Sequence, residues 1–274
     1  MSYYAALGLK KEPFSNSPDP EFFFESNEHK AALTRLLIEI RLRRGWSVIL
    51  GDVGVGKTTL SRKLFQMLKE REDVLFYMIM DPTAGSEELF LQSLVRTFNL
   101  QDQIEGLPTI LDYKETIKKF LFQRGVEDNK TIVLVIDEAQ KLNSASLETL
   151  RVLLNYETND FKLLQLVLFS QMELLPRIKE MKNFFDRIVL KYVVNSLDEA
   201  ETKDFINFRM EHSGLNPSAL LFTDEAISEI YRHSQGYPRR INLICHNALR
   251  GLLVSDKMLI DGSAIREVIA RSVI

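Results

Sequence analysis

The amino-acid sequence predicts an α/β fold, in which helices sandwich a parallel five-stranded sheet, followed by a small all-helical domain. Short apolar runs alternate with helical patterns through most of the chain. The run at residues 131–136 is apolar on both faces, as a central strand covered by helices on both sides should be. After residue 195 this alternation stops. We therefore expect an N-terminal strap at residues 1–27, an α/β domain at 28–195 and a helical domain at 196–274.

The strap is rich in proline, phenylalanine and serine. Pro13, Pro18 and Pro20 fall within eight residues, and prolines at this density forbid a regular helix. Phe14 and the run Phe22–Phe24 argue against disorder, because disordered segments are poor in aromatic residues. We expect an irregular segment whose rings pin it to the folded domain.

The helices and strands of the α/β domain follow in order along the chain. Leu33, Leu36, Leu37 and Ile40 recur at the spacing of one helical face and predict the first helix. The predicted strands lie at residues 46–50, 74–80, 131–136, 163–169 and 188–194. The helices between them are predicted at residues 57–71, 86–98, 111–124 and 144–155.

The helical domain begins with Ser196 to Glu199, which form a capping-box pattern whose helix is expected to run to Gly214. Thr223 before two acidic residues predicts the start of a second helix. A third helix is expected after Pro238 and a fourth at residues 262–270. Cys245 lies among apolar residues at helical spacing, so we expect it to pack and not to react.

Composition narrows the class of protein. The 274 residues are 45% hydrophobic and 27% charged, as in ordinary globular domains, and the formal net charge of −3 gives no global sign of nucleic-acid binding. A single cysteine allows no intrachain disulfide, which fits a reducing compartment. No run approaches the roughly 20 apolar residues of a membrane helix. We expect a cytoplasmic protein without a membrane anchor of its own.

Residues 51–58 match the phosphate-binding pattern G-x-x-x-x-G-K-[ST], directly after a predicted strand and before a predicted helix. Glycines allow backbone N–H groups to turn toward phosphates, and the helix presents its positive N-terminus to the same anion. Lys57 would reach the β- and γ-phosphates, and the Thr58 hydroxyl would hold Mg²⁺. The expected nucleotide-binding residues are Gly51, Asp52, Val53, Gly54, Val55, Gly56, Lys57, Thr58 and Thr59.

Asp137 and Glu138 close the predicted strand at residues 131–136. An Asp at this place can bind the Mg²⁺ held by Thr58, and the adjacent Glu can polarise an attacking water. The alternative is an acidic surface loop, which the apolar strand before the pair disfavours. Together with the glycine-rich loop, this pair indicates ATP hydrolysis.

Ser170 and Gln171 follow the predicted strand at residues 163–169. Polar residues at the carboxyl ends of parallel strands face the ligand crevice, so Gln171 could orient water or contact the γ-phosphate. A helix cap at Ser170 explains the same residues equally well.

Arginines complete many phosphoryl-transfer sites, and Arg177, Arg187, Arg239 and Arg240 are candidates. A second basic group, between Arg35 and Arg44, fits either a nucleic-acid patch or a solvated helix face, and the second interpretation is favoured. The histidines show no metal-ligand spacing.

Taken together, the motifs resemble the ExeA/GspA-type, MshM-like AAA+ ATPases of bacterial secretion and type IV pilus systems, nearly end to end. The motifs that carry the resemblance are Leu7-Gly8-Leu9, Pro13-Phe14, Pro18-Asp19-Pro20, Gly51–Thr59, Ile136–Gln140 and Gly236–Asn242. The segment around Gln171 departs from the family pattern. Longer members continue into a membrane helix and a peptidoglycan-binding domain, so a chain that stops at Ile274 is expected to act on the cell wall through partners.

The resemblance implies roles that spacing alone does not. Arg239, beside Pro238, lies where the family places the sensor-2 arginine. Arg187 is the candidate arginine finger acting on a neighbouring subunit, with Arg177 as the alternative. Gln171 lies in the sensor-1 region, with Ser170 as the alternative, and the strap would lie near the adenine.

The resemblance also implies ATP and Mg²⁺ as cofactors and a homo-oligomeric ring, such as a hexamer. The expected partners belong to a secretion or pilus apparatus, which would hold the protein at the inner membrane without direct insertion. The rival hypothesis is a DNA-dependent AAA+ regulator of the transposition type, motivated by the Arg35–Arg44 cluster.

Overall fold

The computed structural model divides into two compact units. It describes residues 2–17, 19–104, 106–216, 220–254 and 258–271. The sheet unit contains Glu28–Asp52 and Leu60–Val194, and the helical unit contains Met1–Asn27, Val53–Thr59 and Asn195–Ile274. The glycine-rich loop is therefore divided, since Gly51 and Asp52 belong to the sheet unit and residues 53–59 to the helical unit.

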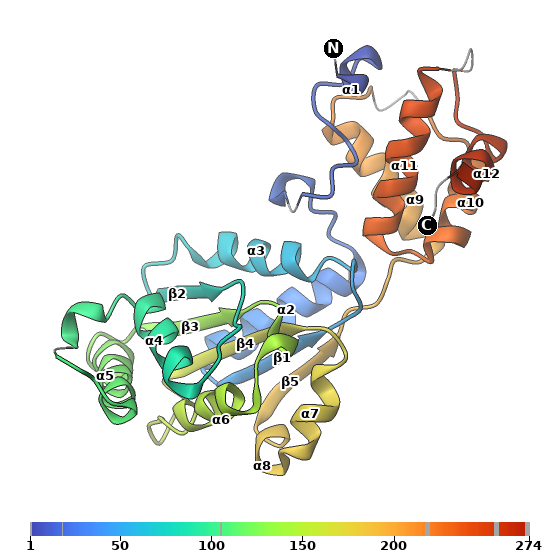
Figure 1. Cartoon of the computed structure of the whole chain (residues 1–274). Coiled ribbons are helices and arrows are strands. Elements are labelled where there is room, and N and C mark those ends of the chain that lie inside the picture. Colours follow the sequence, from blue (N-terminus) through green and yellow to red (C-terminus); the bar gives the residue numbers. More distant parts are fainter. Residues whose placement is uncertain (1, 18, 105, 217–219, 255–257, 272–274) are drawn as a thin grey trace. The chain divides into compact units, whose positions relative to one another are not determined.

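The sheet unit is built on five parallel strands in the order β2-β3-β4-β1-β5 (Figure 1). The strands are β1 Trp46–Leu50, β2 Val74–Ile79, β3 Thr131–Ile136, β4 Leu164–Ser170 and β5 Ile188–Val193. The central strands β3, β4 and β1 are buried at every residue, which explains why their sequences are mostly apolar. The predicted parallel five-stranded sheet is confirmed, with strand ends that differ by one residue.

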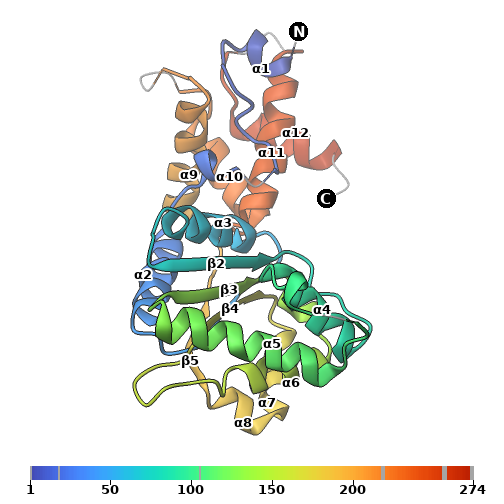
Figure 2. The same ribbon diagram turned by 90° about the vertical axis from the view of Figure 1, so that its left-hand side faces the viewer.

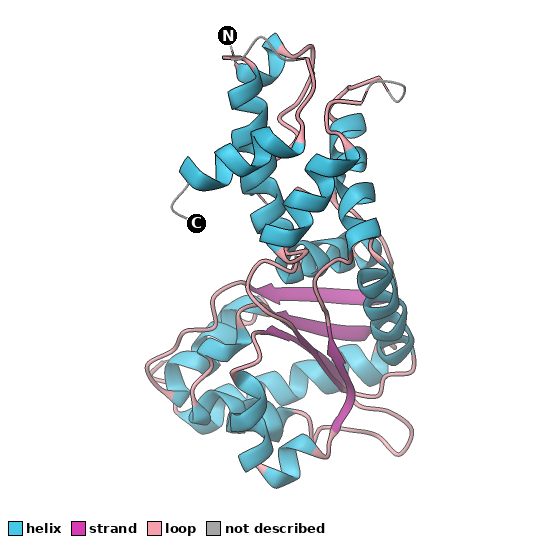
Figure 3. Ribbon diagram, turned by 90° about the vertical axis from the view of Figure 1, so that its right-hand side faces the viewer, coloured by secondary structure: helices cyan, strands magenta, loops and turns pink. Residues whose placement is uncertain are grey.

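Helices cover both faces of this sheet (Figures 2 and 3). The helices of the unit are α2 Asn27–Arg41, α3 Lys57–Leu68, α4 Glu87–Thr97, α5 Ile110–Phe122, α6 Ser144–Leu153, α7 Leu174–Glu180 and α8 Lys182–Phe185. Of these, α7 and α8 were not predicted. Pro176 inside α7 and the four-residue length of α8 leave no helical periodicity to detect.

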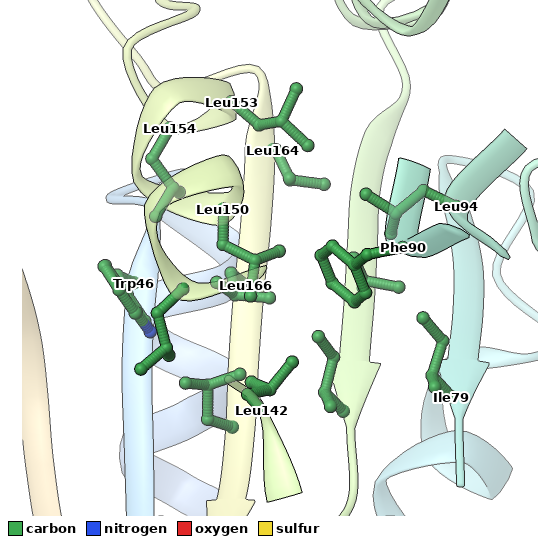
Figure 4. Packing of buried hydrophobic residues seen from close by; sticks show 14 of the residues in the cluster. Trp46, Ile79, Phe90, Leu94, Leu142, Leu150, Leu153, Leu154, Leu164 and Leu166 are labelled. Atoms are coloured by element: carbon green, nitrogen blue, oxygen red, sulfur yellow. The ribbon is translucent and has the colours of Figure 1, made fainter. Parts of the chain in front are cut away.

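The main core of the sheet unit lies between the sheet and helices α4 to α8. Figure 4 shows Leu150 and Leu153 of α6 over Leu164 and Leu166 of β4. Trp46 at the start of β1 contacts the ring of Phe184 in α8. This packing fixes the strands, and with them the loops at their carboxyl ends.

Four longer helices form the helical unit: α9 Glu199–His212, α10 Asp224–Ser234, α11 Pro238–Leu252 and α12 Gly262–Arg271. The predicted capping box at Ser196–Glu199 is wrong by two residues. Asp198 caps α9 by accepting the N–H of Glu201 at 2.7 Å, and the Glu201 carboxylate accepts the N–H of Asp198. The helix therefore starts at Glu199. It ends at His212 and not at Gly214, because Ser213 is its C-cap and Gly214 has a φ of +97°, outside the helical range.

The N-terminal strap packs within the helical unit. It contains a one-turn helix, α1 Tyr3–Ala6, and a 3₁₀ turn at Pro20–Phe22. Leu9 and Phe14 are buried in the core of this unit, where Phe14 contacts Phe222 edge to face. The buried Arg209 of α9 donates to the carbonyls of Pro13, at 2.5 Å, and Ser15, at 3.0 Å.

Candidate functional site

The glycine-rich loop follows β1 and leads directly into α3. Gly54 and Gly56 have φ angles of +90° and +100°, which residues with a Cβ rarely adopt. The pattern requires glycine at position 56, and this conformation favours glycine at position 54 as well, although the pattern leaves that position open. Helix α3 begins at Lys57, so its free N–H groups follow the loop at once, as a phosphate-binding loop requires.

The loop meets the predicted sensor-2 arginine within the helical unit. The N–H of Arg239 points to the carbonyl of Gly54 at 3.4 Å, and a Cβ added to Gly54 would lie 3.0 Å from the Cβ of Arg239. Arg239 follows Pro238 in the first turn of α11. Its guanidinium is exposed and makes no hydrogen bond or ion pair with any residue that the structure describes. It is therefore available to an anion.

The edge of the sheet unit at the carboxyl ends of β3, β4 and β1 gathers the other candidates. Because these strands are adjacent and parallel, Asp137–Glu138, Ser170–Gln171 and Gly51–Asp52 follow one another along one edge. The N–H of Gly51 donates to the carbonyl of Ser170 at 3.2 Å. This arrangement brings together three sequence-predicted segments more than 30 residues apart in the chain.

The carboxylate of Asp137 is 1% exposed and accepts the N–H of Glu138 at 2.9 Å. A buried carboxylate at a strand end is a ligand of the kind that Mg²⁺ prefers, and it fits the predicted metal role. Glu138 has a φ of +51°, in the left-handed region that a residue with a side chain enters at some cost. Such strain is often found at functional sites.

Gln140 also lies at this site, although the Asp137–Glu138 strand-end pattern did not indicate it. Its Nε2 donates to Glu138 Oε2 at 2.7 Å, and its Oε1 accepts from Ser170 Oγ and from the N–H of Gln171, both at 3.2 Å. The signal in the sequence was a polar residue two positions after Glu138, within the turn that follows the strand.

The alternative interpretation of Ser170 as a helix cap is wrong. Ser170 is the last residue of β4 and is fully buried, whereas α7 begins only at Leu174 with Glu173 at its cap position. The hydroxyl and N–H groups of Ser170 and Gln171 face Gln140 instead. Gln171 remains half-buried at the same edge.

The arginine candidates have different surroundings. Arg177 of α7 donates to the carbonyls of Gln140 and Leu142, so it holds the turn after β3. Arg187 is exposed before β5 and donates to Asn155 Oδ1. Arg240 lies over the ring of Tyr237 at 4.8 Å.

The Arg35–Arg44 cluster is not a uniform solvated face. Arg43 donates to Thr131 Oγ1 and the Asn129 carbonyl, lies over the ring of Phe161, and has a pKa lowered by burial. Arg35 lies over the ring of Tyr192 at 5.1 Å. These contacts give at least two of the arginines a role in holding α2 and its following turn.

In the part of the chain that the structure describes, no helix is long and apolar enough to cross a bilayer. The buried Cys245 packs in the core of the helical unit, and burial raises the pKa of its thiol. The prediction of a packing role for Cys245 is confirmed.

Comparisons with known proteins give the same fold. A family model described as an AAA domain matches residues 40–178. General secretion pathway protein A of Aeromonas hydrophila is 35% identical over 251 residues, which cover 90% of this chain and 44% of that protein. The chain thus spans less than half the length of this relative.

Solved structures resemble the chain at low sequence identity, which shows the fold alone. The ORC2 protein of Aeropyrum pernix, solved as ADPNP-ADP complexes, has a TM-score of 0.67 at 18% identity, over 96% of this chain and 72% of that one. Cdc6p of Pyrobaculum aerophilum has a TM-score of 0.66 at 17% identity, over 93% and 69%. With the AAA-domain match, the parallel sheet and the glycine-rich loop before α3, the chain belongs to the AAA+ family of P-loop ATPases.

Proposed function

We propose that the chain binds ATP with Mg²⁺ and hydrolyses it. The observation that carries the proposal is the common edge of β3, β4 and β1, where the start of the glycine-rich loop after β1 and the Asp137–Glu138 pair after β3 lie on either side of the end of β4. A phosphate-binding loop with a carboxylate pair two strands away is an arrangement for phosphoryl transfer.

Each residue has a role in this proposal. The N–H groups of Gly51 to Gly56 and of the first turn of α3 bind the phosphates, with Lys57 on the β- and γ-phosphates. Thr58 and Asp137 would hold Mg²⁺, and a bound Mg²⁺ would supply positive charge against the phosphate oxygens. Thr59, the ninth residue of the loop segment, lies near the α-phosphate.

Hydrolysis needs an activated water and a group that stabilises the developing charge. Glu138 accepts a proton from the attacking water as general base, and Gln171 orients that water. Arg239, whose exposed guanidinium is available to an anion, stabilises charge on the γ-phosphate. The strap lies near the adenine in this proposal.

We further propose that the active form is a homo-oligomeric ring in which Arg187 completes the site of the neighbouring subunit. Arg187 is exposed, whereas Arg177 is bonded to two main-chain carbonyls in its own subunit. Exposure favours Arg187 as the arginine that acts between subunits.

A proposal for the cellular role is supported by the relative whose match covers 90% of this chain. Since that protein is a general secretion pathway component, we propose that ATP hydrolysis drives assembly or operation of a secretion or pilus machine. Partners in that machine would hold the chain at the cytoplasmic side of the inner membrane.

The test combines two variants that are each expected to be inactive. Glu138→Gln should bind ATP but release phosphate about 100-fold more slowly, because it lacks the general base. Arg187→Ala should lose activity to a similar degree. In an equimolar mixture, sites formed by an intact Glu138 and a neighbour's intact Arg187 should recover about a quarter of wild-type activity.

The control is Arg124→Ala, which removes an exposed arginine paired with Asp128 and should retain wild-type turnover. Full activity of Glu138→Gln would contradict the catalytic proposal. No recovery in the mixture would contradict the action of Arg187 between subunits.

The rival function is DNA-dependent regulation. Duplex DNA should then stimulate phosphate release, and the stimulation should fall steeply as salt is raised. The contacts of Arg35 and Arg43 within their own chain weigh against this function. DNA binding at low salt that is lost in Arg41→Ala would favour it over the secretion role.

A further inference from the structure

We propose that Gln140 is a positioning residue for hydrolysis, which holds the Glu138 carboxylate and ties it to the end of β4. The inference rests on the proposed ATPase function. It concerns contacts within the sheet unit alone, between the turn that follows β3 and the last residues of β4.

The amide of Gln140 has one orientation that satisfies all its neighbours. Its NH₂ group donates to the Glu138 carboxylate at 2.7 Å. Its oxygen accepts from two donors, the Ser170 hydroxyl and the Gln171 N–H. A flipped amide would set oxygen against a carboxylate and NH₂ against an N–H group, so the surroundings fix which way the side chain points.

The backbone of the same turn is held from another side. Arg177 donates to the carbonyl of Gln140 at 2.8 Å and to that of Leu142. Glu138 adopts its left-handed φ of +51° at the start of this turn. Both ends of the Gln140 residue are therefore fixed, and an otherwise strained Glu138 is kept in one conformation.

This position matters for a general base. The hydrogen bond from Gln140 occupies Oε2 of Glu138 and leaves Oε1 to accept a proton from water.

The other side of the contact leads to the glycine-rich loop. Ser170, whose hydroxyl bonds Gln140, accepts the N–H of Gly51 through its carbonyl at 3.2 Å. One hydrogen-bonded series thus runs from Glu138 through Gln140 and Ser170 to the first residue of the loop. Gln140 is the member that joins the base to β4.

The experiment measures ATP turnover as a function of ATP concentration. Gln140→Leu keeps the size of the side chain but removes both polar groups, and kcat should fall about 10-fold to 100-fold while KM for ATP changes little. Gln101→Leu, at an exposed glutamine of the same unit, is the matched control and should behave as wild type.

A second variant gives a readout that a purely structural role would not move. Gln140→Glu keeps the length and shape of the side chain but replaces the NH₂ group that donates to Glu138 by an acceptor. A role in packing alone would be kept in this variant, whereas loss of the donor should lower kcat about as far as in Gln140→Leu. Ser170→Ala should lower kcat in the wild-type background but have no further effect beside Gln140→Leu.

The outcomes separate this role from the proposed function. Wild-type turnover in Gln140→Leu, or in Gln140→Glu, would overturn the role of Gln140 while the ATPase proposal stands. A wild-type chain that hydrolyses no ATP would refute the proposed function and, with it, this role. Equal losses in kcat and in nucleotide binding would also overturn positioning.

Discussion

Replacing Arg209 with methionine should loosen the N-terminal strap from the helical unit. Arg209 is 7% exposed and donates to the carbonyls of Pro13 and Ser15. Its guanidinium also lies over the rings of Phe22 and Phe205. Methionine fills the volume of the aliphatic stem but donates no hydrogen bond, so the change isolates the polar contacts.

The size of the change in stability depends on two opposing contributions to the free energy. Burial lowers the pKa of Arg209 to about 10, so removing the charge from water costs about 3 kcal/mol. Hydrogen bonds from a charged donor contribute about 1.5–3 kcal/mol each, and the two ring contacts add about 1 kcal/mol together. The Ser15 carbonyl keeps a donor from Asn242 in the variant, whereas no other described residue donates to the Pro13 carbonyl.

The favourable contacts therefore exceed the cost of burial, and we expect the strap to lose about 2 kcal/mol of stability. Hydrogen exchange of the amides at residues 9–16 measures this directly, because the N–H of Lys10 donates to the Ser213 carbonyl at 2.7 Å only while the strap is docked. Exchange there should accelerate about 30-fold, while amides of β3 should not change.

Arg232→Met, at an exposed arginine of α10 that pairs with Glu229, is the control and should leave strap exchange as in wild type. Unchanged exchange in Arg209→Met would refute the reasoning. It would mean that the cost of burying the charge cancels the hydrogen bonds, and that the rings alone hold the strap.

Three further predictions concern other residues. Gly236→Ala should destabilise the helical unit by more than about 3 kcal/mol in urea unfolding, because its Cβ would lie 1.8 Å from the Leu197 carbonyl oxygen at a φ of +71°. Gly251→Ala, which meets no atom within 4 Å in α11, should be neutral or stabilising by up to about 1 kcal/mol, and equal losses in both would exclude the steric explanation. The Cys245 thiol should resist a thiol reagent in the native chain and react fully in denaturant, because burial raises its pKa; fast native labelling would contradict its packing role. Gly54→Ala should weaken ATP binding without unfolding the sheet unit, because alanine either strains at the φ of +90° or forces the loop out of this conformation. Equilibrium titration with ATP can check this, and unchanged affinity would show that the loop does not need this conformation.

The parts of the fold that local physics decides could be predicted from the sequence. Continuous apolar runs gave the strands, because central parallel strands such as β3 are buried on both faces. Helices with one apolar face, such as α2, were evident from residues that recur every three or four positions. The short α7 and α8 carry too few turns for such a period, and they appeared only in the structure.

The candidate site likewise has a part that could be predicted from the sequence and a part that could not. Gly51 to Thr58 could be recognised because the phosphate loop is one continuous segment whose glycines follow from backbone geometry. Gln140 could not, since its role depends on donors 30 and 31 positions away in β4 and the residue after it. Arg209 is a similar case, because its acceptors lie 196 and 194 residues earlier.

In the sequence, the sheet unit separates the strap from the other helices of the helical unit, and this order has a consequence for biosynthesis. Residues 1–27 leave the ribosome before the sheet unit, but the helices against which Leu9 and Phe14 pack are made after it. The sheet unit, made in between, can complete its core while the strap still has no surface to bury its rings. During synthesis the strap is thus made before the sheet unit but can fold only after it, and nascent chains expose Phe14 until α11 is complete.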